Sequence, residues 1–119
     1  MPPAETCPGP EAIRDPALSR CLAQVKAAIR EAAGEGFRLV LFGSRARGQA
    51  GPYSDVDLLV ILPDHLHTVE MRDRIRDRVY DFSIAGDFLF SVHIVPESVY
   101  LERQGWGTFA TVEREGVVI

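Results

Sequence analysis

The sequence lacks the features that would tie the protein to a membrane, to a long nucleic acid or to a disulfide-stabilised fold. It contains no apolar run of about 18 residues, so no transmembrane helix is expected. Its 13 basic residues are outnumbered by 17 acidic ones, and the net charge of −4 disfavours binding that depends on neutralising many phosphates. Its two cysteines, Cys7 and Cys21, share no metal-ligand spacing with the histidines, and both are expected to be reduced thiols.

The N-terminal stretch "MPPAETCPGP" lacks both the basic and the apolar region of a secretory signal peptide, so the cytoplasm is the expected location. Residues 1–14 contain four prolines, which block regular hydrogen bonding, and we expect a flexible tail there. Residues 15–119 have the length of one domain. The composition of the chain, 46% hydrophobic and 25% charged, is that of an ordinary globular protein.

Hydrophobic spacing predicts both helices and strands over residues 15–119. Asp15 is suited to cap a helix that stops at Gly34, because its side chain can accept hydrogen bonds from the first helical turn. The run "RDRIRDR" (72–78) alternates in charge sign, which predicts a solvated helix face. The expected elements are helices within 15–34, 68–80, 96–105 and 108–116, and strands at 37–42, 55–62 and 88–95. This set predicts a single two-layer α/β (α+β) domain.

The first strand ends abruptly in the stretch "LVLFGSRARG" (39–48). Gly43 permits a sharp turn and a close approach of the backbone to a ligand, and Ser44 can cap a following helical turn. A helix N-terminus with unpaired N–H groups suits a phosphate, although a plain glycine-serine turn is the simpler interpretation. A P-loop is disfavoured, because Gln49 and Ala50 stand where that motif needs lysine and serine or threonine.

Two acidic residues, Asp55 and Asp57, open the second strand at positions i and i+2. Side chains two residues apart along a strand point to the same face, so the two carboxylates can converge on one hard cation. Magnesium is typically held by one or two carboxylates together with substrate phosphates and water. Two acids that merely solvate the mouth of a strand are the alternative. A turn between the strands would bring the acids and the glycine-serine turn to the same sheet edge.

The combined stretch "GSRARGQAGPYSDVD" reads G-S-x10-D-x-D and closely resembles the minimal nucleotidyltransferases of the DNA polymerase β superfamily. That group includes antitoxins that accompany HEPN-domain toxins, and the resemblance covers about residues 15–119. It implies a small mixed sheet flanked by helices, and transfer of a nucleoside monophosphate from a nucleoside triphosphate with loss of pyrophosphate. By position, Gly43 and Ser44 would bind the triphosphate, and Asp55 and Asp57 would be catalytic and hold Mg²⁺ or Mn²⁺.

One departure from this family concerns a third acid, which often stands on the later strand and helps to deprotonate the attacking hydroxyl. The strand "FLFSVHIV" (88–95) carries no acid. Ser91 or Phe90 lies nearest to the expected place, and Asp87 sits just before the strand.

The resemblance implies an antitoxin that transfers AMP from ATP to a hydroxyl, expected to be a tyrosine's, of a HEPN-type toxin. The missing third acid leaves a second interpretation, a catalytically weak or inactive nucleotide-binding module that neutralises its partner by binding alone. The expected partners are a nucleoside triphosphate and a HEPN-domain protein, in a homo- or hetero-oligomer, with no extended nucleic acid and no membrane.

Overall fold

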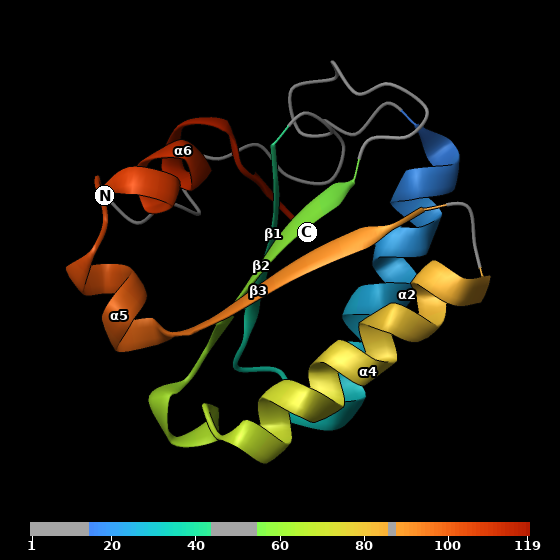
Figure 1. Ribbon diagram of the computed structural model, residues 1–119, viewed down its shortest axis with the longest axis horizontal. Helices are drawn as coiled ribbons and strands as arrows, with labels where there is room; N and C mark the ends of the chain where they lie inside the picture. The colour runs from blue at the N-terminus through green and yellow to red at the C-terminus, as the bar shows by residue number, and fades with distance from the viewer. Residues whose placement is uncertain (1–14, 44–54, 86–87) are drawn as a thin grey trace.

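Short apolar runs form a four-stranded sheet, and segments with helical spacing of apolar residues form its helices, in the structure, a computed structural model that describes residues 15–43, 55–85 and 88–119 (Figure 1). The tail expected at residues 1–14 lies outside the described residues. The helices are α2 (Pro16–Ala33), α4 (Val69–Ala85), α5 (Glu97–Glu102) and α6 (Gly107–Glu115), with the short 3-10 helix η2 (Asp64–Leu66). The strands are β1 (Arg38–Phe42), β2 (Val56–Leu62), β3 (Phe90–Pro96) and β4 (Val117–Val118).

The sheet is mixed, with the strand order β3-β2-β1-β4. β1 pairs antiparallel with β2 and with β4, whereas β2 and β3 run parallel and are joined by a crossover through α4. The register places Phe42 of β1 beside Asp57 of β2, and Asp57 beside Ser91 of β3. These three residues therefore lie in one row across the sheet, on one face.

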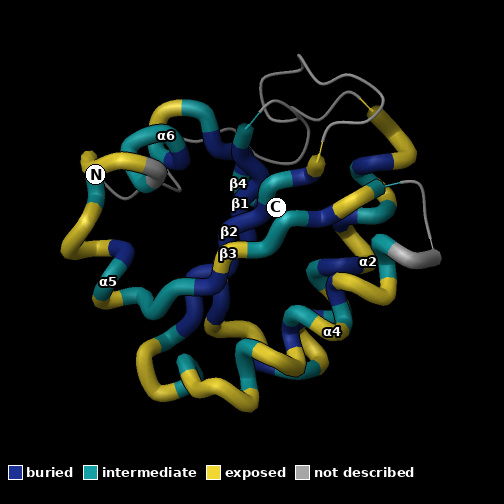
Figure 2. The backbone as a smooth tube through the Cα atoms, viewed as in Figure 1, coloured by how far each residue is buried: buried dark blue, intermediate teal, exposed yellow. Residues whose placement is uncertain are grey.

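Both faces of the sheet are covered by helices. β2 is apolar on both of its faces, and each face needs a helical layer to bury it. α2 and α4 cover one face, where they pack on a core that includes Leu41, Leu58 and Phe90. α5 and α6 pack on the opposite face, against Val40, Phe42, Leu59 and Ile61, chiefly through Tyr100 and Val112. Figure 2 shows β1 and β2 buried along most of their length, β3 only partly buried, and the outer sides of the helices exposed. The α+β class, the mixed sheet and the flanking helices are confirmed. The expected two layers are three, because α5 and α6 cover the second face of the sheet.

Helix α2 begins and ends where its sequence signals predict. The Asp15 carboxylate accepts hydrogen bonds from the main-chain N–H groups of Ala17, at 3.0 Å, and Leu18, at 3.3 Å. Gly34 ends the helix with a φ of 76°. Among the helices of the described residues, none is long and apolar enough to cross a membrane.

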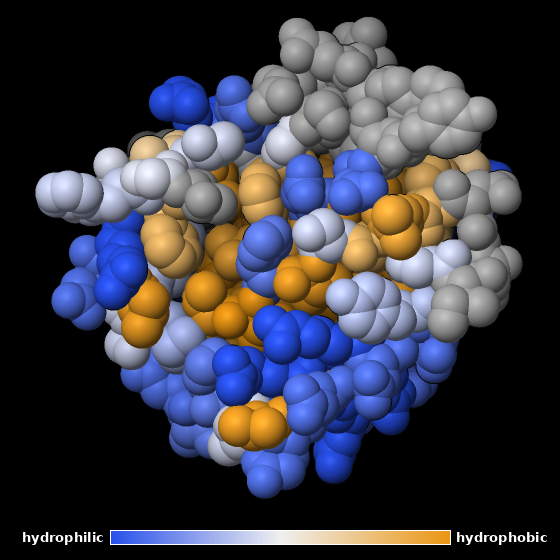
Figure 3. Space-filling view, in the orientation of Figure 1, coloured by the Kyte–Doolittle hydropathy of each residue, from blue (hydrophilic) through white to orange (hydrophobic). Residues whose placement is uncertain are grey.

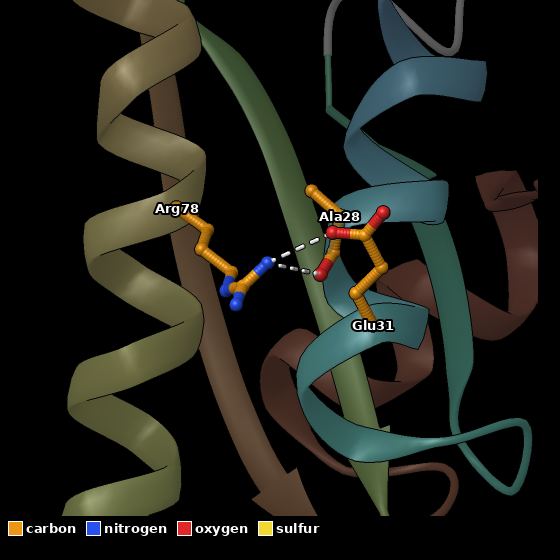
Figure 4. Close-up of polar contacts among 3 residues, drawn as sticks. All are labelled: Ala28, Glu31 and Arg78. Carbon is orange, nitrogen blue, oxygen red and sulfur yellow. Dashed lines mark hydrogen bonds and ion pairs between the residues drawn. The ribbon is translucent and has the colours of Figure 1, made fainter.

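A polar contact joins α2 to α4 at the surface (Figure 4). An Arg78 guanidinium nitrogen donates to the main-chain oxygen of Ala28, at 3.5 Å, and lies 3.2 Å from the Glu31 carboxylate. Because the Glu31 side chain is 74% exposed, water screens this ion pair, and the buried apolar residues between the two helices contribute more to their packing.

Candidate functional site

The candidate residues gather where β1 leaves the sheet and β2 enters it. Because these strands are antiparallel, the last residue of β1 and the first residues of β2 lie at the same end of the two strands, which is one edge of the sheet. Gly43 directly follows β1, and Asp55 directly precedes β2. The structure therefore brings Gly43, Asp55 and Asp57 to one edge. Ser44 lies outside the described residues.

Gly43 faces the carboxylate of Asp57. A Cβ atom at Gly43 would overlap with Oδ2 of Asp57 and would lie 3.3 Å from its Cγ. Gly43 also has a φ of 79°, a left-handed conformation that side chains rarely adopt. The turn alone explains the positive φ, but it does not explain why the space beside the glycine is taken by a carboxylate. The site thus places the half-buried backbone of Gly43 against an acidic side chain.

The two aspartates differ in their surroundings. Asp57 is half-buried, and it interrupts a strand whose other residues are all buried. Asp55 is exposed, just outside the strand. Both offer hard carboxylate oxygens, which Mg²⁺ and Mn²⁺ prefer. The described residues contain no group of three or more His, Cys, Asp or Glu side chains that could hold a metal ion. Two carboxylates still fit a cation whose remaining ligands come from substrate phosphates and water.

The position beside Asp57 on β3 belongs to Ser91, which is half-buried. Phe90, by contrast, is 2% exposed and belongs to the core under α2 and α4. Asp87 lies outside the described residues. Of the candidates for the third acidic position, Ser91 is therefore the one in register with Asp57, and it is not an acid.

An exposed histidine on the same face was not singled out as a site residue by the sequence analysis. His93 follows Ser91 by two residues, so it shares the face of Asp57. Its ring lies 5.7 Å from the Phe42 ring, with the two planes tilted by 51°. The alternation of β3 predicts its face, but the contact with Phe42 depends on a strand order that alternation does not reveal.

A shallow hollow of about 280 Å³ lies at the other end of the sheet, where Pro63, Asp64, Glu97, Ser98 and Leu101 line it. Asp64 accepts a hydrogen bond from the main-chain N–H of Ser98, at 2.9 Å, and the bonds from Ser98 lower the pKa of the Asp64 carboxyl. Asp64 thus caps the first turn of α5. Since Pro63 and Glu97 follow the C-terminal ends of β2 and β3, the hollow lies far from Asp55 and Asp57 and is not part of the candidate site.

The family model described as "Nucleotidyltransferase domain" matches residues 22–98, more than half of the chain. The matched segment runs from α2 into α5 and includes Gly43, Asp55, Asp57 and Ser91. No curated protein matches the chain.

Proposed function

The chain belongs to the nucleotidyltransferase domain family, and from that premise we propose that it transfers AMP from ATP to a hydroxyl of a partner protein. The observation that carries this proposal is the contact between the Gly43 backbone and the Asp57 carboxylate at one edge of the sheet. A nucleoside triphosphate needs backbone N–H groups for its phosphates and carboxylates for the cation that accompanies them. Both kinds of group belong to this edge.

Each site residue has a role in this proposal. The turn at Gly43 and Ser44 would bind the triphosphate, and Asp55 and Asp57 would hold Mg²⁺ or Mn²⁺. The cation would neutralise the charge that develops on the phosphate oxygens. The acceptor oxygen would attack the α-phosphorus and lose its proton, while the bond to pyrophosphate breaks and pyrophosphate leaves with the electron pair.

The proposed acceptor is a tyrosine of a HEPN-domain toxin, which makes this protein an antitoxin of the cytoplasm. Support comes from the G-S-x10-D-x-D stretch, which resembles antitoxins that accompany such toxins. The net charge of −4 further disfavours a long nucleic acid as the acceptor, because a polyanion would be repelled. A protein hydroxyl avoids that repulsion.

A second function is favoured by one observation, the serine beside Asp57. If a third acid is needed to deprotonate the acceptor, a site with Ser91 in that position binds nucleotide but transfers it slowly. The protein would then neutralise its partner by covering it, as a nucleotide-binding module.

Co-expression with a HEPN-domain protein encoded beside this chain separates the two functions. Intact-mass measurement of the partner should show added units of one AMP, and these should disappear when this chain carries Asp57→Asn. A stable complex in which the partner keeps its unmodified mass would favour the binding module. If no complex forms and no mass is added, both proposals are wrong.

A further inference from the structure

Strand β3 has an open edge. β2 pairs with one side of it, and no strand of the described residues pairs with the other. In a parallel ladder, backbone groups of alternate residues point to opposite sides. The Val56 N–H donates a hydrogen bond to the Leu89 carbonyl oxygen, at 2.8 Å, so the backbone groups of Leu89 point toward β2. The backbone N–H and carbonyl groups of Ser91, His93 and Val95 therefore also point toward β2. The backbone groups of Phe90, Val92 and Ile94 therefore point outward.

The two ends of this edge are already closed. The outward N–H of Phe90 donates to the Ser83 hydroxyl of α4, at 3.0 Å, and Pro96 has no N–H to offer. Between them, the N–H groups of Val92 and Ile94 have no hydrogen-bond partner among the described residues, so they can pair with an added strand, as can the carbonyls that point outward. β3 carries no Asp, Glu, Lys or Arg, the charged side chains that commonly protect an exposed edge. Figure 3 shows an apolar band over β3 at the centre of this view.

Two arginines of α4 border the edge. The contact of Ser83 with Phe90 shows which side of α4 faces β3, and at about 100° per residue Arg72 and Arg76 lie on that same side. Arg78, by contrast, lies on the side that contacts α2. In the part of the chain that the structure describes, no ion pair joins Arg72 or Arg76 to a carboxylate, and the buried Nε of Arg72 has no hydrogen-bond partner. Figure 3 shows strongly hydrophilic residues below the apolar band.

We propose that the β3 edge surface, made of Phe90–Ile94 together with Arg72 and Arg76, binds an extended acidic segment of a partner protein as an added strand. The open N–H and carbonyl groups would bind the backbone of that segment, and its carboxylates would pair with the two arginines. A second copy of this chain fits less well. Two β3 strands paired about a two-fold axis would bring Arg72 and Arg76 of both copies together, and like charges repel.

The test is a binding assay without nucleotide, so its result is independent of the proposed transfer activity. The probe is a fluorescently labelled short peptide of alternating threonine and glutamate, and the matched control has lysine in place of glutamate. The glutamates of the acidic peptide can form two surface ion pairs with Arg72 and Arg76, whereas the lysines of the control peptide cannot. The full chain should therefore bind the acidic peptide about tenfold more tightly at low salt. The difference should shrink at high salt.

Two variants separate backbone pairing from charge. Val92→Pro removes an outward N–H but none that pairs with β2, so it should fold, as circular dichroism would check, and lose peptide binding. The double variant Arg72→Glu and Arg76→Glu keeps the backbone and should prefer the lysine peptide. Equal affinity of the wild type for the two peptides, or an unchanged preference in the double variant, would overturn the proposal. Sedimentation showing a dimer that Val92→Pro dissociates would also overturn it, in favour of a second copy.

Discussion

Gly43 and Gly34 both adopt a positive φ, 79° and 76°, but a Cβ atom would meet different surroundings at each. At Gly34 nothing lies within 4 Å, whereas at Gly43 the atom would overlap with the Asp57 carboxylate. An alanine at either position should lower the free energy of unfolding by about 1–2 kcal/mol, the cost of a left-handed residue. Only Gly43→Ala should also push Asp57 aside.

We therefore expect Gly43→Ala to weaken binding of ATP with Mg²⁺ by a factor of about ten or more, or ~1.4 kcal/mol. Gly34→Ala is the matched control and should bind as the wild type does. Titration calorimetry measures the affinities, and urea unfolding measures the stability of each variant. Equal ATP affinity in the two variants would show that nucleotide does not approach the Gly43 backbone.

Ser91 stands in register with Asp57, so Ser91→Asp would place a third carboxylate beside the candidate metal ligands. The half-buried position has access to solvent, and we expect the variant to fold. If a missing base limits the reaction, AMP transfer should rise, since a positioned base is typically worth about 10²–10⁴-fold. Radiolabelled AMP transfer to the partner measures the rate, and Ser91→Asn controls for shape without charge.

Phe90→Asp tests the neighbouring position of β3, whose side chain lies on the other face of the sheet. Phe90 is 2% exposed, and a charge there would be buried without a partner, so this variant should unfold. Should Ser91→Asp fold but transfer no faster than Ser91→Asn, the third acid is not what limits the protein.

The edge shared by Gly43, Asp55 and Asp57 could be predicted because it depends on local features, the end of one strand and the i, i+2 spacing in the next. The choice between Ser91 and Phe90 depends on the register of β3 against β2. A slip of one residue would exchange the two faces, and the turn and spacing motifs do not exclude that slip. The contact between His93 and Phe42 depends on the same register and on a strand order that places β2 between them.

At the scale of elements, the ends of a helix could be predicted where its capping residues directly flank it in the sequence. Asp15 and Gly34 mark the ends of α2, and both signals are visible in the sequence. α4 runs five residues past its expected end at residue 80, to Ala85, and Phe82 in this extra stretch packs on the core. β4 was not predicted at all. Its two residues become a strand only because they pair with Val40 and Leu41 of β1.

Helix α5 is capped from a distant part of the chain, and this cap should depend on pH. The first turn of α5 has no side-chain cap of its own from Pro96, and Asp64 of η2 supplies the acceptor for the Ser98 N–H. Hydrogen bonds from Ser98 lower the pKa of Asp64 below its ordinary value of 3.8. The cap therefore stabilises the fold fully above pH 3.8, and this contribution is lost as the pH falls through the lower pKa of the folded state.

We expect Asp64→Ala to unfold at a lower urea concentration than the wild type at pH 7, and the two midpoints to converge in acid. Asp73→Ala is a suitable control, because it removes an exposed carboxylate of α4 for which the described structure shows no hydrogen bond. Urea unfolding at neutral and acidic pH, followed by circular dichroism, gives the midpoints. A difference between Asp64→Ala and the wild type that stays constant down to the lowest pH would contradict the capping role.

At the scale of the molecule, the candidate site and the β3 edge surface are neighbours. Ser91 lies beside Asp57, and the next residue, Val92, turns its backbone outward to the open edge. An added strand would lie about 4.8 Å beyond β3, which is one strand spacing. A partner segment bound there would hold the rest of that partner close to the row of Phe42, Asp57 and Ser91. The two proposals are thus compatible in space, although each has its own test.

The charge of the whole molecule determines how nucleotide can bind. The protein has a net charge of −4, and two of its carboxylates, those of Asp55 and Asp57, lie at the site itself, so a bare triphosphate is repelled. A divalent cation between the phosphates and the carboxylates reverses that repulsion.

We expect ATP to bind in the presence of Mg²⁺ or Mn²⁺ and to lose most of its affinity in EDTA. Asp57→Asn removes one of the two proposed ligands, so it should weaken the metal-dependent binding in a protein that still folds. Asp73→Asn removes the same single negative charge at an exposed position on α4, outside the site, and controls for net charge alone. Calorimetry that finds the same ATP affinity with and without EDTA would rule out Asp55 and Asp57 as the residues through which the nucleotide is held.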